Sequence, residues 1–186
     1  WININANVYS NWFRNKIEGM WSNDQTELHY INIGKSRLAG VETMCKIQIN
    51  RHINVHGAYN YLYTSKDADG VRLSSSSPHS GNIRAEYNTR IPRYATVVNL
   101  SGNIMGKKKF DVLDELEIDG KKVEAYYQAK VNPYCLWDLT VSQYIMQNLR
   151  ITAGITNLFD YTSDRVTFNT STSPGRNYFI ACNYTL

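Results

Sequence analysis

A few histidine, arginine and tyrosine residues in this sequence lie outside its regular apolar patterns and could hold a small ligand. They are His29, Arg72, His79, Tyr126 and Tyr127. Imidazole and phenol rings hold aromatic or chelating ligands by stacking or ligation, and loops on a rigid scaffold often carry recognition. We treat these five as candidate ligand-contacting residues of loops. The alternative for each is a solvated loop residue or the cap of a strand.

Only one group of residues suggests catalysis. His79 and Ser80 are adjacent, and Asp67 and Asp69 precede them. A hydrolytic triad depends on geometry in space, and a Ser–His pair adjacent in sequence rarely has that geometry. We therefore expect no catalytic residues, and we expect the protein not to be an enzyme.

Composition restricts the remaining function classes. The chain has 186 residues and a formal net charge of +4, and its one run of cations is 107–109. That is too little clustered charge for nucleic-acid binding. The cysteines Cys45, Cys135 and Cys182 have no metal-ligand spacing, so neither a metal nor a cofactor site is expected. No stretch of 18 apolar residues suggests a membrane helix.

The C-terminal residues show the clearest secondary-structure pattern. Tyr178, Ile180, Cys182, Tyr184 and Leu186 alternate with residues that are mostly small or polar, namely Ala181, Asn183 and Thr185. Such period-two alternation predicts a strand with two unlike faces. An apolar row of this kind is typical of the closing strand of an outer-membrane barrel, and we regard these residues as a C-terminal assembly strand. An edge strand of a soluble sandwich shows the same alternation.

The same pattern recurs along the chain and predicts about eight strands. Charged residues such as Arg84, Glu86 and Arg150 alternate with apolar rows that carry almost no charge. A charge facing lipid would cost about 2–4 kcal/mol for Arg or Lys at the midplane. We therefore predict an all-β fold, an antiparallel up-and-down segment of a transmembrane β-barrel. The expected strands before the last are 2–12, 30–50, 53–64, 82–90, 94–104, 137–142 and 149–156.

The expected connections alternate between short and long. Short turns are expected at 51–52, 92–93 and 147–148, and long loops at 19–29, 65–78, 106–133 and 161–174. Outer-membrane barrels have short turns on one rim and long loops on the other. We expect the short turns to share the periplasmic rim with the C-terminus. A soluble lipocalin-like binder has no reason to sort its loops in this way.

Several motifs resemble a known family. Asn157-Leu158-Phe159-Asp160, then Pro174-Gly175-Arg176 and a terminal alternating strand, resemble the C-terminal end of TonB-dependent outer-membrane receptors. Other pieces match in order: Ile31-Asn-Ile-Gly-Lys35, Gly40-Val-Glu42, Ser77-Pro-His79 and Trp137-Asp-Leu139. One departure is Leu186, since the family usually ends in an aromatic residue.

The resemblance implies that residues 1–186 are the last eight of about 22 strands, with the plug domain and earlier strands absent. It implies import of a scarce nutrient, of the iron–siderophore, haem or cobalamin class, across the outer membrane of a Gram-negative cell. Implied partners are the rest of the barrel, the plug, the TonB complex, the barrel assembly machinery, lipid and the nutrient, but no nucleic acid. The alternative is a complete small eight-stranded barrel with a structural or adhesion role.

Overall fold

The structure is a computed structural model that describes residues 1–21, 27–65, 77–118, 121–146, 148–163 and 174–185. Within these ranges every regular element is a β-strand. The described residues contain no helix that is long and apolar enough to cross a membrane. The strands are β1 (Ile2–Trp21), β2 (Leu28–Gln48), β3 (Ile53–Thr64), β4 (His79–Asn88), β5 (Thr96–Met105), β6 (Lys108–Ile118), β7 (Lys121–Val131), β8 (Tyr134–Ile145), β9 (Leu149–Thr156) and β10 (Asn177–Tyr184).

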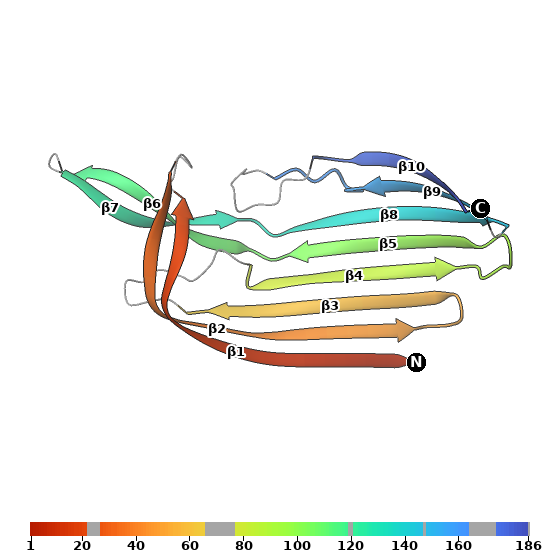
Figure 1. Cartoon of the computed structure of the whole chain (residues 1–186), viewed down its shortest axis with the longest axis horizontal. Coiled ribbons are helices and arrows are strands. Elements are labelled where there is room, and N and C mark those ends of the chain that lie inside the picture. The colour runs from red at the N-terminus through yellow and green to blue at the C-terminus, as the bar shows by residue number, and fades with distance from the viewer. Residues whose placement is uncertain (22–26, 66–76, 119–120, 147, 164–173, 186) are drawn as a thin grey trace.

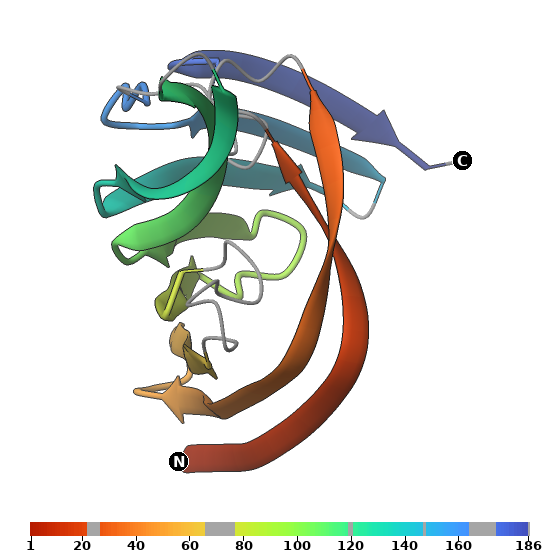
Figure 2. The same cartoon turned by 90° about the vertical axis from the view of Figure 1, so that its left-hand side faces the viewer.

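Eight of these strands form one antiparallel sheet in the order β1-β2-β3-β4-β5-β8-β9-β10 (Figure 1). Each strand pairs with its neighbour in the chain, except that β5 pairs with β8 because β6 and β7 form a separate hairpin between them. The predicted all-β, up-and-down antiparallel fold is confirmed. The strands β1 and β10 lie at opposite margins of a curved wall (Figure 2). A closed eight-stranded barrel would require them to pair, so the sheet order contradicts that alternative.

The strand register sorts the side chains by polarity. One line of paired residues crosses all eight strands and is apolar throughout: Ile2, Ile47, Val55, Ala85, Leu100, Leu139, Ile155 and Tyr178. The neighbouring line, one residue along each strand, is polar: Asn3, Lys46, His56, Arg84, Ser101 and Asp138. Since alternate residues of a strand point to opposite faces, the sheet has an apolar face and a polar face.

The two faces carry the charges as predicted from the sequence. From β3 to β10, the rows of the apolar face contain no Asp, Glu, Lys or Arg. Arg84, Glu86 and Arg150 lie on the polar face with Asn99 and Asn183. The sheet is a single layer, and Val131 is the only buried hydrophobic residue among those described. The apolar face is therefore not covered by any described part of this chain.

The short connections and both termini lie together at one end of the sheet (Figure 1). Backbone bonds join Trp1 to Gln48, and Thr185 to Asn148, at this end. The Asn50 side chain accepts the backbone N–H groups of His52 and Ile53, which closes the β2–β3 turn. The predicted turns at 51–52, 92–93 and 147–148 lie at the same end of the sheet, as expected. The sorting by length is only partial, because the connection at 92–93 extends from 89 to 95 and is longer than the connection between Trp21 and Leu28 at the other end.

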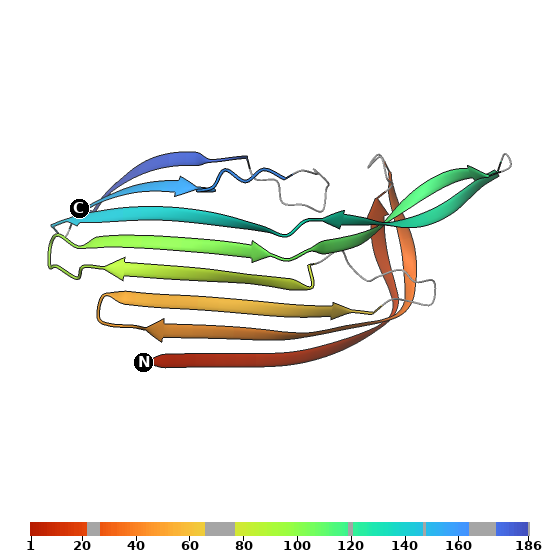
Figure 3. The ribbon, with the colours of Figure 1, turned by 180° about the vertical axis from the view of Figure 1, so that it is seen from behind.

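Two predicted loops were wrong in extent. The segment 106–133 is mostly the paired hairpin of β6 and β7, which projects beyond the wall (Figure 3). The segment 19–29 is shortened because β1 continues to Trp21 and β2 begins at Leu28. The strand β1 bends where Asn15 takes a left-handed conformation, with φ of 55° (Figure 3). The predicted loops 65–78 and 161–174 lie mainly outside the described residues.

Aromatic side chains cover buried glycines on the neighbouring strand. Tyr9 lies over Gly40, Trp137 over Gly102 and Phe179 over Gly154, and each pair is directly opposite in the register. A Cβ added to Gly102 would lie 2.9 Å from the Trp137 ring. These glycines are therefore required for space, because the cross-strand ring fills the volume of the missing side chain.

Candidate functional site

A hollow of about 620 Å³ lies on the polar face near the long-loop end of the wall. Strands β2, β3, β4, β5 and β8 form it. The sheet is curved (Figure 2), and a hollow formed by five neighbouring strands is what the concave side of such a sheet provides, so we infer that the polar face is the inner face of the wall. Its polar-face lining comprises Glu42, Met44, Ala58, Asn60, Ser80, Asn82, Asn103, Met105, Tyr134 and Leu136.

Amide side chains provide most of the chemistry of the hollow. Asn82 and Asn103 are direct cross-strand partners, and Glu42 is opposite Asn60. The Oδ1 atom of Asn60 is buried and has no hydrogen-bond partner among the described residues. Amides both donate and accept hydrogen bonds, and a carboxylate accepts them. The hollow is therefore suited to hydrogen bonding with a polar surface or solute. Its lining combines these polar side chains with apolar ones, as binding surfaces often do.

Next to the hollow, towards the short turns, the polar face carries a hydrogen-bonded charged group. The Arg84 guanidinium donates to Asn99 Oδ1 from both Nε and Nη2, at 3.2 and 2.9 Å. The same guanidinium lies 3.7 Å from the Glu86 carboxylate. The guanidinium is about half exposed, with a side-chain exposed fraction of 55%, which suits a face in contact with water.

The motif that begins with Asn157 forms a hydrogen-bonded junction at the end of β9. Asn157 is 4% exposed and has a φ of 52°. Its backbone N–H donates to Asp138 Oδ1 at 2.9 Å, its Nδ2 donates to the Tyr161 carbonyl at 2.7 Å, and its Oδ1 accepts the Tyr161 N–H at 2.8 Å. The Leu158 N–H donates to the Trp137 carbonyl at 2.6 Å. These bonds reverse the chain and attach it to β8.

The second half of the motif attaches to the same junction. Asp160 also has a positive φ, and its Oδ1 accepts the Arg176 N–H at 2.7 Å. Gly175 has a φ of 86°, and a Cβ there would lie 3.2 Å from the same oxygen. The Asp160 carboxylate therefore links the chain after β9 to the start of β10, and Gly175 provides the conformation and the space for the link. Phe159 is exposed and Pro174 precedes the link.

Comparison with known proteins identifies this architecture. The family model for the TonB-dependent receptor-like β-barrel matches residues 1–158. The chain belongs to the TonB-dependent receptor β-barrel family. The recognition from sequence motifs, the barrel-segment fold and the Gram-negative outer membrane as its location are therefore confirmed.

Solved structures extend the likeness of fold over nearly the whole chain. The siderophore receptor PirA from Acinetobacter baumannii is 17% identical, with a TM-score of 0.71 and cover of 98% of this chain and 29% of its own. The ferripyoverdine receptor of the outer membrane of Pseudomonas aeruginosa, bound to ferripyoverdine, is 16% identical, with a TM-score of 0.70. The match covers 98% of this chain and 25% of that receptor. The ferric preacinetobactin receptor BauA from Acinetobacter baumannii is 14% identical, with a TM-score of 0.64, and the match covers 98% of this chain and 27% of that receptor. The chain thus spans less than a third of each receptor.

In this TonB-dependent barrel neither His29 nor His79 lines the hollow. His29 lies in the extension of β2, where its Nε2 is 3.4 Å from the Glu27 carboxylate. Tyr126 and Tyr127 are backbone partners of Leu113 and Val112 in the β6–β7 hairpin. Arg72 lies outside the described residues. The ligand-contacting role of these residues stays a prediction.

His79 occupies a different environment from the one that the sequence suggested. It begins β4 on the apolar face, where its Nδ1 is hydrogen-bonded to the Tyr59 hydroxyl at 2.7 Å and its ring lies 5.1 Å from that of Tyr61. Ser80 is a lining residue of the hollow, on the opposite face. The structure therefore contradicts a His79–Ser80 catalytic pair, because the two side chains leave the strand in opposite directions. Asp67 and Asp69 lie outside the described residues.

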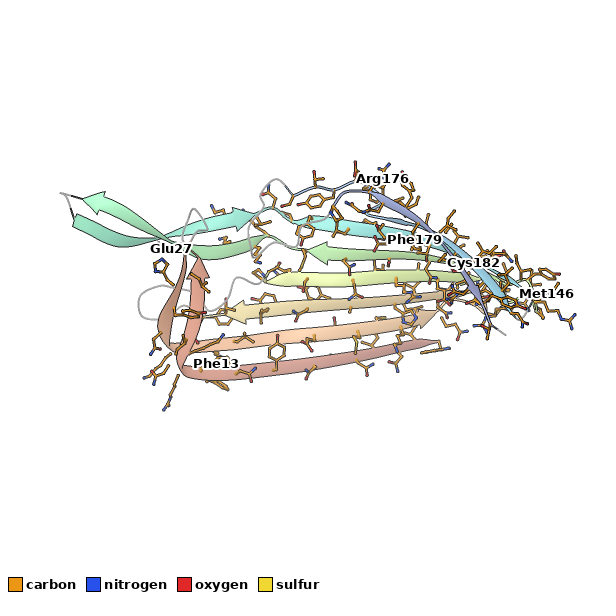
Figure 4. All side chains as sticks on the ribbon, turned by 45° about the horizontal axis from the view of Figure 1, so that its top comes forward. Phe13, Glu27, Met146, Arg176, Phe179 and Cys182 are labelled. Carbon is orange, nitrogen blue, oxygen red and sulfur yellow. The ribbon has the colours of Figure 1, made fainter. Side chains whose placement is uncertain are left out.

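The C-terminal strand has the orientation that the alternation predicted. Tyr178, Ile180, Cys182 and Tyr184 lie on the apolar face, opposite Ile155, Ala153, Ile151 and Leu149. Ile180 is 80% exposed, and Figure 4 shows Cys182 and Phe179 on this margin of the wall. Leu186 lies outside the described residues. Cys182, Cys45 and Cys135 are free thiols, and no group of metal-binding residues occurs within the described part.

Sequence reasoning did not find the hollow or the partners of the Asn157 junction. No motif linked Asp138 or Tyr161 to Asn157, although Asp138 is part of the Trp137-Asp-Leu139 motif. Tyr161 also stacks on Tyr134, with ring centroids 5.0 Å apart. The available signal was the polar Asp138 in an otherwise apolar strand start, which indicates a specific hydrogen-bond partner.

Proposed function

We propose that residues 1–186 form the C-terminal part of the barrel wall of a larger TonB-dependent receptor that imports a ferric siderophore. Haem and cobalamin are the other nutrient classes considered for such a receptor. The similarity of fold to three receptors whose names include a siderophore favours the siderophore class. The observation that carries the proposal is the register, which puts one uninterrupted apolar line on the outside of the wall and amides and charges on the hollowed inside.

The partners follow from the surfaces of the wall. The outer edges of β1 and β10 have unpaired backbone groups within the described sheet, and lipid cannot satisfy them. We infer that the remaining barrel strands pair there, and that the plug domain contacts the amide-lined hollow. Engagement of the TonB complex through another part of the receptor, insertion by the barrel assembly machinery and contact of the apolar face with lipid belong to the same proposal.

The long-loop end is proposed to gather the nutrient outside the cell. The β6–β7 hairpin, which contains Tyr126 and Tyr127, extends beyond the wall at this end (Figure 1), and His29 lies near the start of β2. Arg72 lies between β3 and β4 in the sequence, outside the described residues, and remains a candidate from the sequence alone. His79 is the weakest candidate, because its ring is already engaged by Tyr59 and Tyr61. The segment itself performs no chemistry in this proposal.

Uptake of radioactive iron tests the proposal. The full-length receptor is expressed in a Gram-negative host that lacks its own siderophore receptors, and ferric siderophores, haem and cobalamin are supplied separately. We expect uptake of at least one ferric siderophore, and loss of that uptake when TonB is deleted. Uptake of haem or cobalamin alone would contradict the siderophore assignment, and uptake that is independent of TonB would contradict the transport mechanism.

A further inference from the structure

Three cations lie together on the part of the apolar face that β1 and β2 form, whereas the rows of this face from β3 to β10 carry no charge. Arg14 is the direct cross-strand partner of Lys35, and Arg37 is the partner of Trp12 in the same hairpin. Residues two positions apart in a strand lie on the same face. Arg14 therefore shares a face with Trp12, and Lys35 shares a face with Arg37, so all three cations lie on the side of Trp12. Phe13, which precedes Arg14 in the sequence, lies at the end of the wall away from Met146 (Figure 4).

The cluster lies at the level where the lipid-facing part of the wall ends. The apolar row of β1 runs from Ile2 through Val8 to Trp12, which is the length that a transmembrane strand needs, about 9–11 residues. The neighbouring strand β3 ends at Thr64, and Ser65 exchanges two hydrogen bonds with the Arg37 backbone. A tryptophan at the end of such a row marks the membrane–water interface. The three cations are therefore placed at the depth of the lipid headgroups.

No described group neutralises these charges. Arg14, Lys35 and Arg37 are all exposed, and no carboxylate within the described residues lies within ion-pair distance of them. Like charges placed directly across a strand pair, as Arg14 and Lys35 are, destabilise the pair unless an anion lies between them. Their arrangement is thus suited to an external anion.

Arg37 is held in place for such an anion. Its Nε donates to the Ser10 hydroxyl at 2.9 Å, and its guanidinium carbon lies 5.1 Å from the centre of the Trp12 ring. These contacts use one of the five N–H donors and fix the plane of the guanidinium, which leaves the remaining donors for a ligand. A preorganised guanidinium binds phosphate with two parallel hydrogen bonds, and a lysine adds a point charge.

We propose that Arg14, Lys35 and Arg37 form a binding site for the phosphate group of a phosphorylated lipid in the leaflet at the long-loop end. The lipid chains would lie along the apolar rows of β1 and β2 below the cluster, next to Val8 and Val41. A soluble phosphate makes only the polar half of these contacts. The site is separate from the hollow, which opens on the other face.

Native mass spectrometry of the full-length receptor tests this site. The receptor in detergent is titrated with phosphatidic acid, which has a phosphate monoester headgroup, and in parallel with zwitterionic phosphatidylcholine. We expect a phosphatidic acid adduct that is stronger than the phosphatidylcholine adduct. Replacement of all three cations, Arg14→Gln, Lys35→Gln and Arg37→Gln, should weaken phosphatidic acid binding by about tenfold or more.

A matched control removes the same charge at the same end of the molecule. Lys107, Lys109 and Lys130, each changed to Gln, lie in and beside the β6–β7 hairpin. Lys109 and Lys130 are also direct cross-strand partners, so this control removes a pair of like charges that lacks the arginine held by Ser10 and Trp12. This variant should bind phosphatidic acid as the wild type does. The single change Arg37→Lys keeps the charge but loses the planar fork, and it should weaken binding by less than the triple change.

Three outcomes would overturn the proposal. Equal binding by the triple variant and the wild type would show that the cluster does not bind the lipid. Equal loss in the Lys107, Lys109 and Lys130 variant would show unspecific attraction. Full competition by inorganic phosphate at the same concentration as the lipid would assign the site to free phosphate. Heat-modifiable gel mobility checks that each variant is folded. Siderophore uptake is recorded separately, so that a failure of the transport proposal can be distinguished from a failure of the lipid-site proposal.

Discussion

Asn157 shows how a short sequence motif acts through backbone geometry. Its left-handed conformation, with φ of 52°, is tolerated by asparagine better than by most residues. Its side chain then satisfies both backbone groups of Tyr161, and its own N–H reaches Asp138 on the neighbouring strand. The motif could be recognised from the sequence, but its partners could not, because they depend on how β8 and β9 are aligned.

Asn157→Ala should loosen this junction. The change removes two hydrogen bonds at a buried site and places alanine in a left-handed conformation, which together cost about 2–3 kcal/mol. Amide hydrogen exchange at Leu158 and Tyr161 in the full-length receptor should become roughly 30- to 150-fold faster. Asn157→Gly removes the same bonds without the conformational cost, so its exchange should lie between that of wild type and alanine. Unchanged exchange in both variants would contradict the role of the side chain.

The five candidate ligand residues illustrate the limit of residue-level prediction. Composition and position suggested a shared role, but only three-dimensional contacts could reveal that His79 is bonded to Tyr59 on the apolar face. A residue at the start of a strand faces either side according to the register, and one step of register reverses its environment.

At the scale of elements, the period-two pattern predicted eight strands of the wall and missed the β6–β7 hairpin. The sequence contains the signal that was missed. Asp-Gly, found at 119–120, is a dipeptide that favours two-residue hairpin turns, and Val123, Ala125, Tyr127 and Ala129 alternate with polar or bulky residues after it. The length of β1 was missed for another reason. Its pattern changes at Asn15, where the positive φ bends the strand, so that no single alternation covers it.

Gly40→Ala should destabilise the β1–β2–β3 part of the wall. A Cβ at this buried position would lie 2.6 Å from the Tyr61 carbonyl oxygen, a backbone atom that cannot move without disturbing the strand pairing, and it would also meet the Tyr9 ring. We expect a loss of about 1–3 kcal/mol in the free energy of unfolding, measured by urea titration of the full-length barrel in lipid vesicles.

Gly57→Ala is the matched control for this change. Gly57 lies on β3 in the same sheet, and the nearest atom to an added Cβ is the Asn82 carbonyl oxygen at 4.0 Å. This variant should unfold at the same urea concentration as the wild type or at a slightly higher one. If both alanine variants had equal stability, packing against Gly40 would not be a determinant of the fold.

At the scale of the whole molecule, the two rims follow from loop lengths that are visible in the sequence, whereas the hollow does not. The hollow depends on the curvature of five strands and on which side chains point into it, and neither is encoded in a local pattern. The open order of the sheet is likewise a property of the assembled strands. Eight alternating segments alone were consistent with a closed barrel or with part of a larger one.

The orientation of the two rims predicts opposite accessibility in living cells. Lys107 follows β5 at the long-loop end, and Arg93 lies in the β4–β5 connection at the short-turn end, and both are exposed. A membrane-impermeant maleimide added to intact cells should label Lys107→Cys in the full-length receptor and leave Arg93→Cys unlabelled until the outer membrane is opened. Labelling of Arg93→Cys in intact cells would reverse the proposed orientation.

The central claim is that the apolar face contacts lipid and the polar face lines a watery interior. Spin labels placed one at a time at positions 83 to 86 of the full-length receptor in lipid bilayers, with all native cysteines replaced, test this claim directly. We predict that collision with oxygen, which concentrates in lipid, is high at Ile83 and Ala85, and that collision with a water-soluble nickel chelate is high at Arg84 and Glu86. Oxygen collision that is high at Arg84 and Glu86, or equal at all four positions, would contradict the account.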